Sequence, residues 1–138
     1  MQRLKSRPQF QAVLAGSVLA RTSHFALHCV ALHANQAQED RQALFGVDDV
    51  WLGAMVPKRW AKRAVTRNTI KRQVYAVSQE FALSLSQAAH VVRLRSSFDR
   101  QHFVSATSDA LKAAVRLELQ QLFAKATGQS LGVRLRQP

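Results

Sequence analysis

Residues 51–81 of this 138-residue chain, WLGAMVPKRWAKRAVTRNTIKRQVYAVSQEF, decide the fold. The mostly apolar residues 51–56 predict a strand, which ends because Pro57 has no N–H for a sheet ladder. Beyond it, apolar residues recur at i, i+4, i+7 and i+11, namely at Ile70, Val74, Val77 and Phe81. This spacing predicts a helix that begins at residues 64–66 and docks a single apolar stripe onto a sheet.

Positive charge is concentrated between this strand and this helix. Residues 58–72 contain seven basic residues and no acidic one: Lys58, Arg59, Lys62, Arg63, Arg67, Lys71 and Arg72. A solvated helix face is the common interpretation of such a run, but it normally has acids interleaved at i, i+4 spacing. We therefore expect residues 58–63 to form a loop leading into the helix N-terminus, where unpaired N–H groups favour phosphate. Asn68 adds a group that can both donate and accept hydrogen bonds.

Two further elements are predicted on the N-terminal side. Residues 8–14 have apolar side chains at helical spacing and a proline suited to a first turn, so we expect a short helix that ends near Gly16. Residues 24–33 approximate the period-two alternation of a strand. The polar stretch 35–50 is expected to be an exposed connection in which two adjacent acids are solvated, Asp48 and Asp49.

The C-terminal side completes the predicted architecture. The pattern of residues 90–95 predicts a strand with Arg93 and Arg95 on one face. A last helix is expected over 105–125, with an apolar face of Leu111, Val115, Leu119, Leu122 and Phe123. The order of elements predicts an α+β fold, a two-layer α/β sandwich of a small mixed sheet and three main helices. A single domain is expected over 1–127, followed by a tail over 128–138.

Composition limits the class of protein. Hydrophobic residues make up 47% of the chain, which excludes a disordered tail. Twenty Lys and Arg against eight Asp and Glu give a net charge of +12, a field that indicates a polyanion partner. No stretch approaches the roughly 18 apolar residues of a membrane span. The lone Cys29 cannot form an internal disulfide and is expected to be buried. With neither a membrane span nor a signal-peptide pattern in the sequence, we expect a cytoplasmic protein with no membrane partner.

The sequence offers no self-sufficient active site and no metal site. The acids are few and scattered, whereas a protein nuclease needs a general base and acid or clustered carboxylates that hold metal ions. None of the histidines has a partner at ligand spacing: His24, His28, His33, His90 and His102. We therefore predict no catalytic residue and no metal ligand in this chain, and any phosphodiester chemistry would come from a partner.

Aromatic residues near the predicted first helix and strand have two interpretations. Phe10 and the apolar residues of the strand could line a groove on which bases stack, each stack being worth roughly 1–3 kcal/mol. Alternatively, Phe10 and Phe25 belong to the core. For either residue alone the two interpretations are left open.

The segment 56–72 resembles the signature of the bacterial ribonuclease P protein family. Its diagnostic core, Ala-Val-x-Arg-Asn-x-x-Lys-Arg, is matched without a gap by Ala64, Val65, Arg67, Asn68, Lys71 and Arg72. The resemblance extends to residues 4–13, where the family has its opening helix, and to residues 25–27, 52–53 and 91–92. Most of the chain is covered.

The resemblance implies a specific activity and fold. It implies the protein subunit of a holoenzyme in which a catalytic RNA uses Mg²⁺ to remove the 5′ leader of precursor tRNA by endonucleolytic cleavage, with no DNA partner. The protein would bind this RNA and would contact the single-stranded leader in a cleft between first helix and sheet. The fold implied has a left-handed βαβ crossover around the signature helix, an exception to the right-handed rule.

The resemblance also assigns residues to these roles. RNA binding would fall to Lys58, Arg59, Lys62, Arg63, Arg67, Asn68, Lys71 and Arg72. The leader cleft would hold Phe10, Leu14, His28 and Tyr75. Leu14 and His28 stand where many relatives have a Phe and a Tyr, and Tyr75 stands where the pattern usually has an Arg.

Two other functions are alternatives to the one that the resemblance implies. A basic ribosomal or ribosome-assembly protein could use the same helix to bind RNA without a catalytic partner, and its binding would be indifferent to a 5′ leader. A free-standing nuclease would have to cleave RNA as pure protein.

Overall fold

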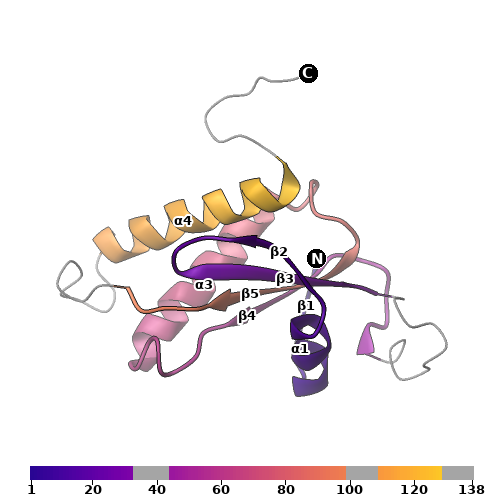
Figure 1. The fold of residues 1–138 in the computed structure, drawn as a ribbon, viewed down its shortest axis with the longest axis horizontal. Coiled ribbons are helices and arrows are strands. Elements are labelled where there is room, and N and C mark those ends of the chain that lie inside the picture. The colour runs from indigo at the N-terminus through magenta and orange to yellow at the C-terminus, as the bar shows by residue number, and fades with distance from the viewer. Residues whose placement is uncertain (33–43, 99–108, 129–138) are drawn as a thin grey trace.

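The computed structural model describes residues 1–32, 44–98 and 109–128, which form an α+β fold around one sheet (Figure 1). Its helices are α1 (Arg7–Leu14), α3 (Ala64–Glu80) and α4 (Asp109–Thr127). Its strands are β1 (Gln2–Arg3), β2 (Ser17–Arg21), β3 (Phe25–Ala31), β4 (Trp51–Met55) and β5 (Ala88–Leu94). They are ordered β1-β4-β5-β3-β2, with β1, β4 and β5 parallel and β3 and β2 antiparallel to their neighbours. The predicted class, mixed sheet and three main helices are confirmed.

The unit β4–α3–β5 has the form that residues 51–81 predict. β4 ends at Met55, two residues before Pro57, and α3 begins at Ala64 within the predicted window. Because β4 and β5 pair in parallel, α3 is the crossover between them. The left hand of this crossover stays a prediction of the family resemblance.

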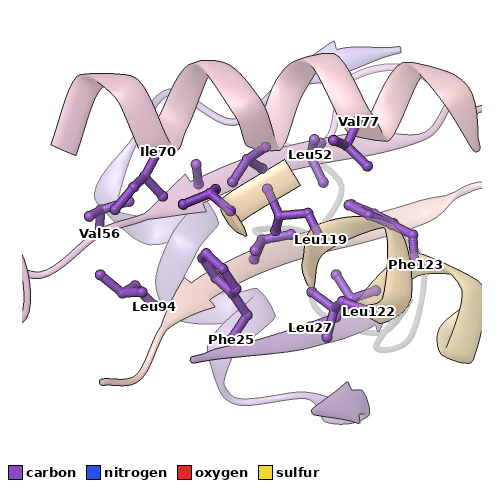
Figure 2. Close-up of a cluster of buried hydrophobic side chains, with 14 of the residues drawn as sticks. Phe25, Leu27, Leu52, Val56, Ile70, Val77, Leu94, Leu119, Leu122 and Phe123 are labelled. Atoms are coloured by element: carbon purple, nitrogen blue, oxygen red, sulfur yellow. The ribbon is translucent and has the colours of Figure 1, made fainter. Parts of the chain in front are cut away.

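The larger core lies between the sheet and the pair α3 and α4 (Figure 2). Every residue of the predicted apolar face of α4 is buried there. The rings of Phe81 and Phe123 stack across the two helices with centroids 5.6 Å apart. Phe25 is fully buried in this core, so of its two interpretations the structure supports the core residue and not the groove residue.

A smaller core lies on the opposite face of the sheet under α1, which Figure 1 places on the other side of the strands from α4. A capping box fixes the start of α1, since Ser6 Oγ accepts from the Gln9 N–H and Gln9 Oε1 accepts from the Ser6 N–H. The helix ends before Gly16, as predicted. We call this side of the sheet the α1 face. The alternation of side chains along β3, β4 and β5 places on it Ala26, His28, Gly53, Val91 and Arg93.

Two strands were not predicted. β1 is only two residues long, and its place beside β4 is set by bonds such as Leu4 N–H to the Leu52 carbonyl (2.9 Å), so no periodicity announces it. β2 has a register shift between Val18 and Ala20, which interrupts the alternation that identifies a strand. Together they form the two edges of the sheet.

The described part of this connection, residues 44–50, is partly buried and partly exposed. Phe45 is buried, with its ring centroid 5.7 Å from that of Trp51. Asp49 lies 3.4 Å from the N-terminal amine and accepts hydrogen bonds from Gln2 and the Val50 N–H. The Val50 N–H is the main reason why the pKa of Asp49 is lowered. Asp48 is exposed as predicted, whereas Asp49 is partly exposed and also holds the N-terminus.

One further prediction is corrected, and three others cannot be compared with the described residues. Cys29 is half-buried instead of fully buried, and burial raises the pKa of its thiol. Residues 35–43, the predicted helix start at residue 105 and the tail from 129 onward lie outside the described residues.

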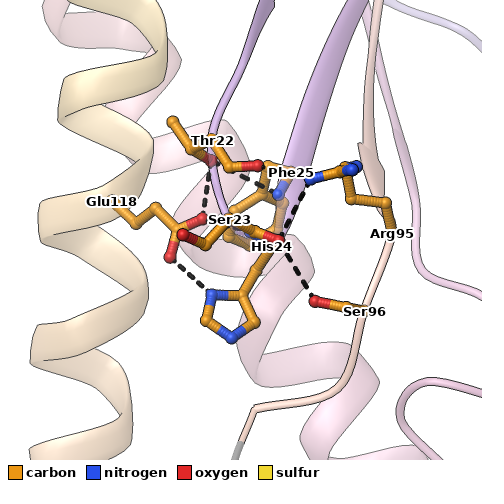
Figure 3. Close-up of polar contacts among 7 residues, drawn as sticks. All are labelled: Thr22, Ser23, His24, Phe25, Arg95, Ser96 and Glu118. Carbon is orange, nitrogen blue, oxygen red and sulfur yellow. Dashed lines mark hydrogen bonds and ion pairs between the residues drawn. The ribbon is translucent and has the colours of Figure 1, made fainter.

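A polar cluster joins α4 to the turn between β2 and β3 (Figure 3). Glu118 accepts from Thr22 Oγ1 and the His24 N–H, both at 2.6 Å, and contacts His24 Nδ1 at 2.7 Å. Arg95, which follows β5, donates to the carbonyls of Thr22 (2.8 Å) and Ser23 (3.2 Å). These contacts fix the end of the sheet from which the basic loop also leaves.

Candidate nucleic-acid interface

The loop that carries the first four cations is held by its own backbone and by apolar anchors. The N–H groups of Trp60 and Ala61 both donate to the Pro57 carbonyl, at 3.1 and 3.2 Å. Ala61 is buried in the larger core and Trp60 packs against it. With these two side chains turned inward, the basic residues of the loop are exposed: Lys58, Arg59, Lys62 and Arg63.

The N-terminus of α3 is open to an anion. Arg63 is the N-cap residue, and its side chain makes no capping hydrogen bond. The first turn contains no acid. A helix start with neither a side-chain cap nor an acid leaves its first N–H groups to solvent or to an external anion.

The remaining signature residues extend from this point along α3. Asn68 and Arg72 are exposed and one helical turn apart, while Arg67 and Lys71 are half-exposed on the flank. The structure therefore brings all eight predicted RNA-binding residues to the loop and the N-terminal half of one helix.

Arg67 has an internal role that the sequence did not reveal. Its Nη1 donates to the carbonyl oxygens of Ala61 (3.0 Å) and Lys62 (2.8 Å). The guanidinium therefore joins α3 to the loop and holds the loop cations in place, in addition to carrying charge itself.

Replacing Arg67 by glutamine should loosen this loop. Losing a charged donor that bonds two carbonyls costs on the order of 1 kcal/mol at a half-exposed site, so trypsin should cut after Lys58, Arg59, Lys62 or Arg63 about five-fold faster. Mass spectrometry of the fragments gives the rate at each site. Arg72→Gln, with the same loss of charge on the exposed side, should leave these rates unchanged. Equal rates in wild type and Arg67→Gln would show that Arg67 does not hold the loop.

Three of the four predicted cleft residues meet at the α1 face, two of them from helix α1 and one from the sheet. Phe10 is half-buried and its ring lies directly over Gly53 of β4, where no Cβ separates ring from backbone. Leu14 is also half-buried against the smaller core. His28, on β3, is 7% exposed. Phe10 is thus partly packed against the smaller core and partly exposed, and its role in base stacking stays a prediction.

Tyr75 is not brought to this group. It lies on α3, which packs on the opposite face of the sheet, and it contacts the larger core. The guanidinium of Arg3 lies 3.9 Å from the centroid of its ring, at the β1 edge. The helical wheel places Tyr75 away from the apolar stripe, but it does not say which sheet face α3 covers.

Two arginines that the sequence analysis did not assign lie on the α1 face. The strand register places Arg93 of β5 beside Ala26, with Arg21 of β2 on the other side of Ala26. Arg93 Nε donates to His28 Nε2 at 3.1 Å. Burial, followed by the charges of Arg93 and Arg21, lowers the pKa of His28, which favours the neutral ring.

The described residues lack two features of other functional classes. Within residues 1–32, 44–98 and 109–128, no group of three or more His, Cys, Asp or Glu could hold a metal ion. None of the helices in these ranges is long and apolar enough to span a membrane.

Comparison with known proteins identifies the family. The family model described as Ribonuclease P matches residues 1–126. The ribonuclease P protein component of Ralstonia pickettii is 35% identical over 125 residues, covering 91% of this chain and 79% of the relative. That of Bordetella parapertussis is 32% identical over 123 residues, covering 89% of each chain.

Solved structures show the same fold. The RNase P protein of Staphylococcus aureus superposes with a TM-score of 0.64 at 19% identity, over 91% of this chain and 95% of that one. The RNase P protein of Thermotoga maritima gives a TM-score of 0.56 at 18% identity, over 88% and 98%. With a family model that spans nearly the whole chain, this protein belongs to the ribonuclease P protein family.

Proposed function

We propose that this chain is the RNA-binding subunit of a ribonuclease P holoenzyme, in which a partner RNA cuts precursor tRNA. In this proposal the segment 58–72 binds the catalytic RNA, and the α1 face contacts the single-stranded 5′ leader. Mg²⁺ belongs to the RNA, and the reaction is endonucleolytic removal of the leader in the cytoplasm.

The observation that carries the proposal is the exposed, acid-free basic loop that leads into an uncapped helix N-terminus. Cations around free helix N–H groups bind phosphate oxygens through charge and through directed hydrogen bonds together. Such a surface binds RNA, and it supplies neither a general base nor a nucleophile. The family assigns the cutting to an RNA partner, and these chemical properties fit that division.

Reconstitution tests the proposal. Chain and catalytic RNA together should cleave precursor tRNA at low Mg²⁺, where neither component alone does so. Affinity should be higher for precursor tRNA than for mature tRNA. Cleavage by the RNA that is unchanged when the chain is added would overturn the proposal. RNA binding that is indifferent to the leader would favour the ribosomal or assembly alternative.

A further inference from the structure

The α1 face carries a fixed positive charge that the signature does not include. Arg93 is half-exposed, and its position follows from β5, where it shares a face with Val91 of the smaller core. The register pairs Arg93 with Met55, the last residue of β4 before the chain enters the basic loop. Arg93 therefore lies next to the start of the basic segment, on the sheet face that Phe10 partly covers.

The partner of Arg93 orients it without neutralising it. His28 Nε2 accepts from Arg93 Nε, so the proton of the neutral ring lies on Nδ1. An uncharged acceptor holds the guanidinium in one orientation and leaves its charge uncompensated. The close contacts between basic and acidic groups that the described residues show join Met1 to Asp49, His24 to Glu118 and Arg116 to Glu80, and none of them includes Arg93.

The geometry favours an anion at the free edge of this guanidinium. With Nε bound to His28, the two Nη groups are the donors that match two oxygens of a phosphate. Arg21 of β2 lies on the other side of Ala26 from Arg93, and it adds a second positive charge. Two nearby cations repel each other until a bound anion compensates them.

We propose that Arg93, positioned by His28, binds a backbone phosphate of the single-stranded RNA that crosses the α1 face. This rests on the proposed function, because it takes the leader as the strand on this face. Phe10 would contact a base while Arg93 contacts the backbone. The strand would then continue from the α1 face toward the basic loop at Pro57.

The test measures the affinity of reconstituted holoenzyme for precursor tRNA and for mature tRNA at several salt concentrations. The salt slope is the decrease in the logarithm of affinity per unit increase in the logarithm of salt concentration. One phosphate contact on a single strand contributes about 0.7 to this slope, which corresponds to about four-fold in affinity at ~0.15 M salt. Arg93→Gln should show this loss for precursor tRNA and none for mature tRNA. Lys112→Gln, with the same charge change on exposed α4, should behave as wild type.

Two further variants separate charge from orientation. Arg93→Lys keeps the charge but loses the planar Nε–Nη arrangement, so it should restore the salt slope and only part of the affinity. His28→Phe keeps a ring but removes the acceptor. If His28 acts through Arg93, the double variant His28→Phe, Arg93→Gln should bind precursor tRNA no more weakly than Arg93→Gln alone.

The outcomes distinguish the two proposals. If wild-type holoenzyme binds precursor and mature tRNA equally, leader contact fails and the assignment of Arg93 fails with it. If wild type discriminates and Arg93→Gln discriminates equally well, the assignment of Arg93 alone is overturned. Fully additive losses in the double variant would overturn the positioning role of His28.

Discussion

Replacing Lys62, Arg63 and Arg72 together by glutamine is expected to weaken binding of the catalytic RNA about a hundred-fold. These side chains are exposed, and they lie on the loop, at the N-cap and on the outer side of α3. Each phosphate contact on a duplex contributes a salt slope of about 0.9, or about five-fold in affinity at ~0.15 M salt. Three contacts multiply to about a hundred-fold, and the slope should fall by about 2.7. Filter binding or calorimetry across a salt series measures both quantities.

A matched control removes the same charge from another part of the molecule. Lys112, Arg116 and Lys125 are exposed on α4, and their triple glutamine variant also lowers the net charge by three. Were binding driven by net charge alone, both triple variants would lose affinity equally. Loss confined to the 58–72 variant locates the interface, whereas an unchanged slope in that variant would assign these cations to a solvated face.

The unit from β4 to α3 was predictable because its signals are local. A proline after an apolar run ends the strand. The helical spacing of the apolar residues from Ile70 to Phe81 predicts the helix and its start. The exposure of Asn68 and Arg72 on α3 follows from the same helical wheel. These inferences need no knowledge of which strands are neighbours, and they agree with the structure almost residue for residue.

The parts that were missed depend on contacts between distant segments. His28 and Arg93 meet because β3 pairs with β5, two strands separated by more than fifty residues and by β4 in the chain. The family resemblance groups Tyr75 with Phe10, although α3 and α1 cover opposite sheet faces. The carbonyls that Arg67 bonds are only five and six residues away, but they belong to a loop, where no periodicity in the sequence places the backbone. Residue spacing in the sequence contains none of these distances.

Gly53→Ala is expected to reduce the affinity of the holoenzyme for precursor tRNA about ten-fold, through the side chain that lies on Gly53. A Cβ at this position would lie 2.6 and 2.7 Å from Phe10 Cε1 and Cζ and 2.9 Å from Leu4 Cδ1. The ring of Phe10 must therefore move off β4. Overpacking of this kind costs roughly 1–3 kcal/mol of stability, and loss of a base stack costs a similar amount in binding.

The expected pattern separates the α1 face from the basic segment. Gly53→Ala should leave affinity for the catalytic RNA unchanged, since α3 packs on the other sheet face. Gly46→Ala is the control, because a Cβ there meets nothing within 4 Å. If Phe10 is the displaced group, adding Gly53→Ala to Phe10→Ala should cost little further stability or affinity. Equal discrimination between precursor and mature tRNA by Gly53→Ala and wild type would remove Phe10 from the leader site and leave it a core residue.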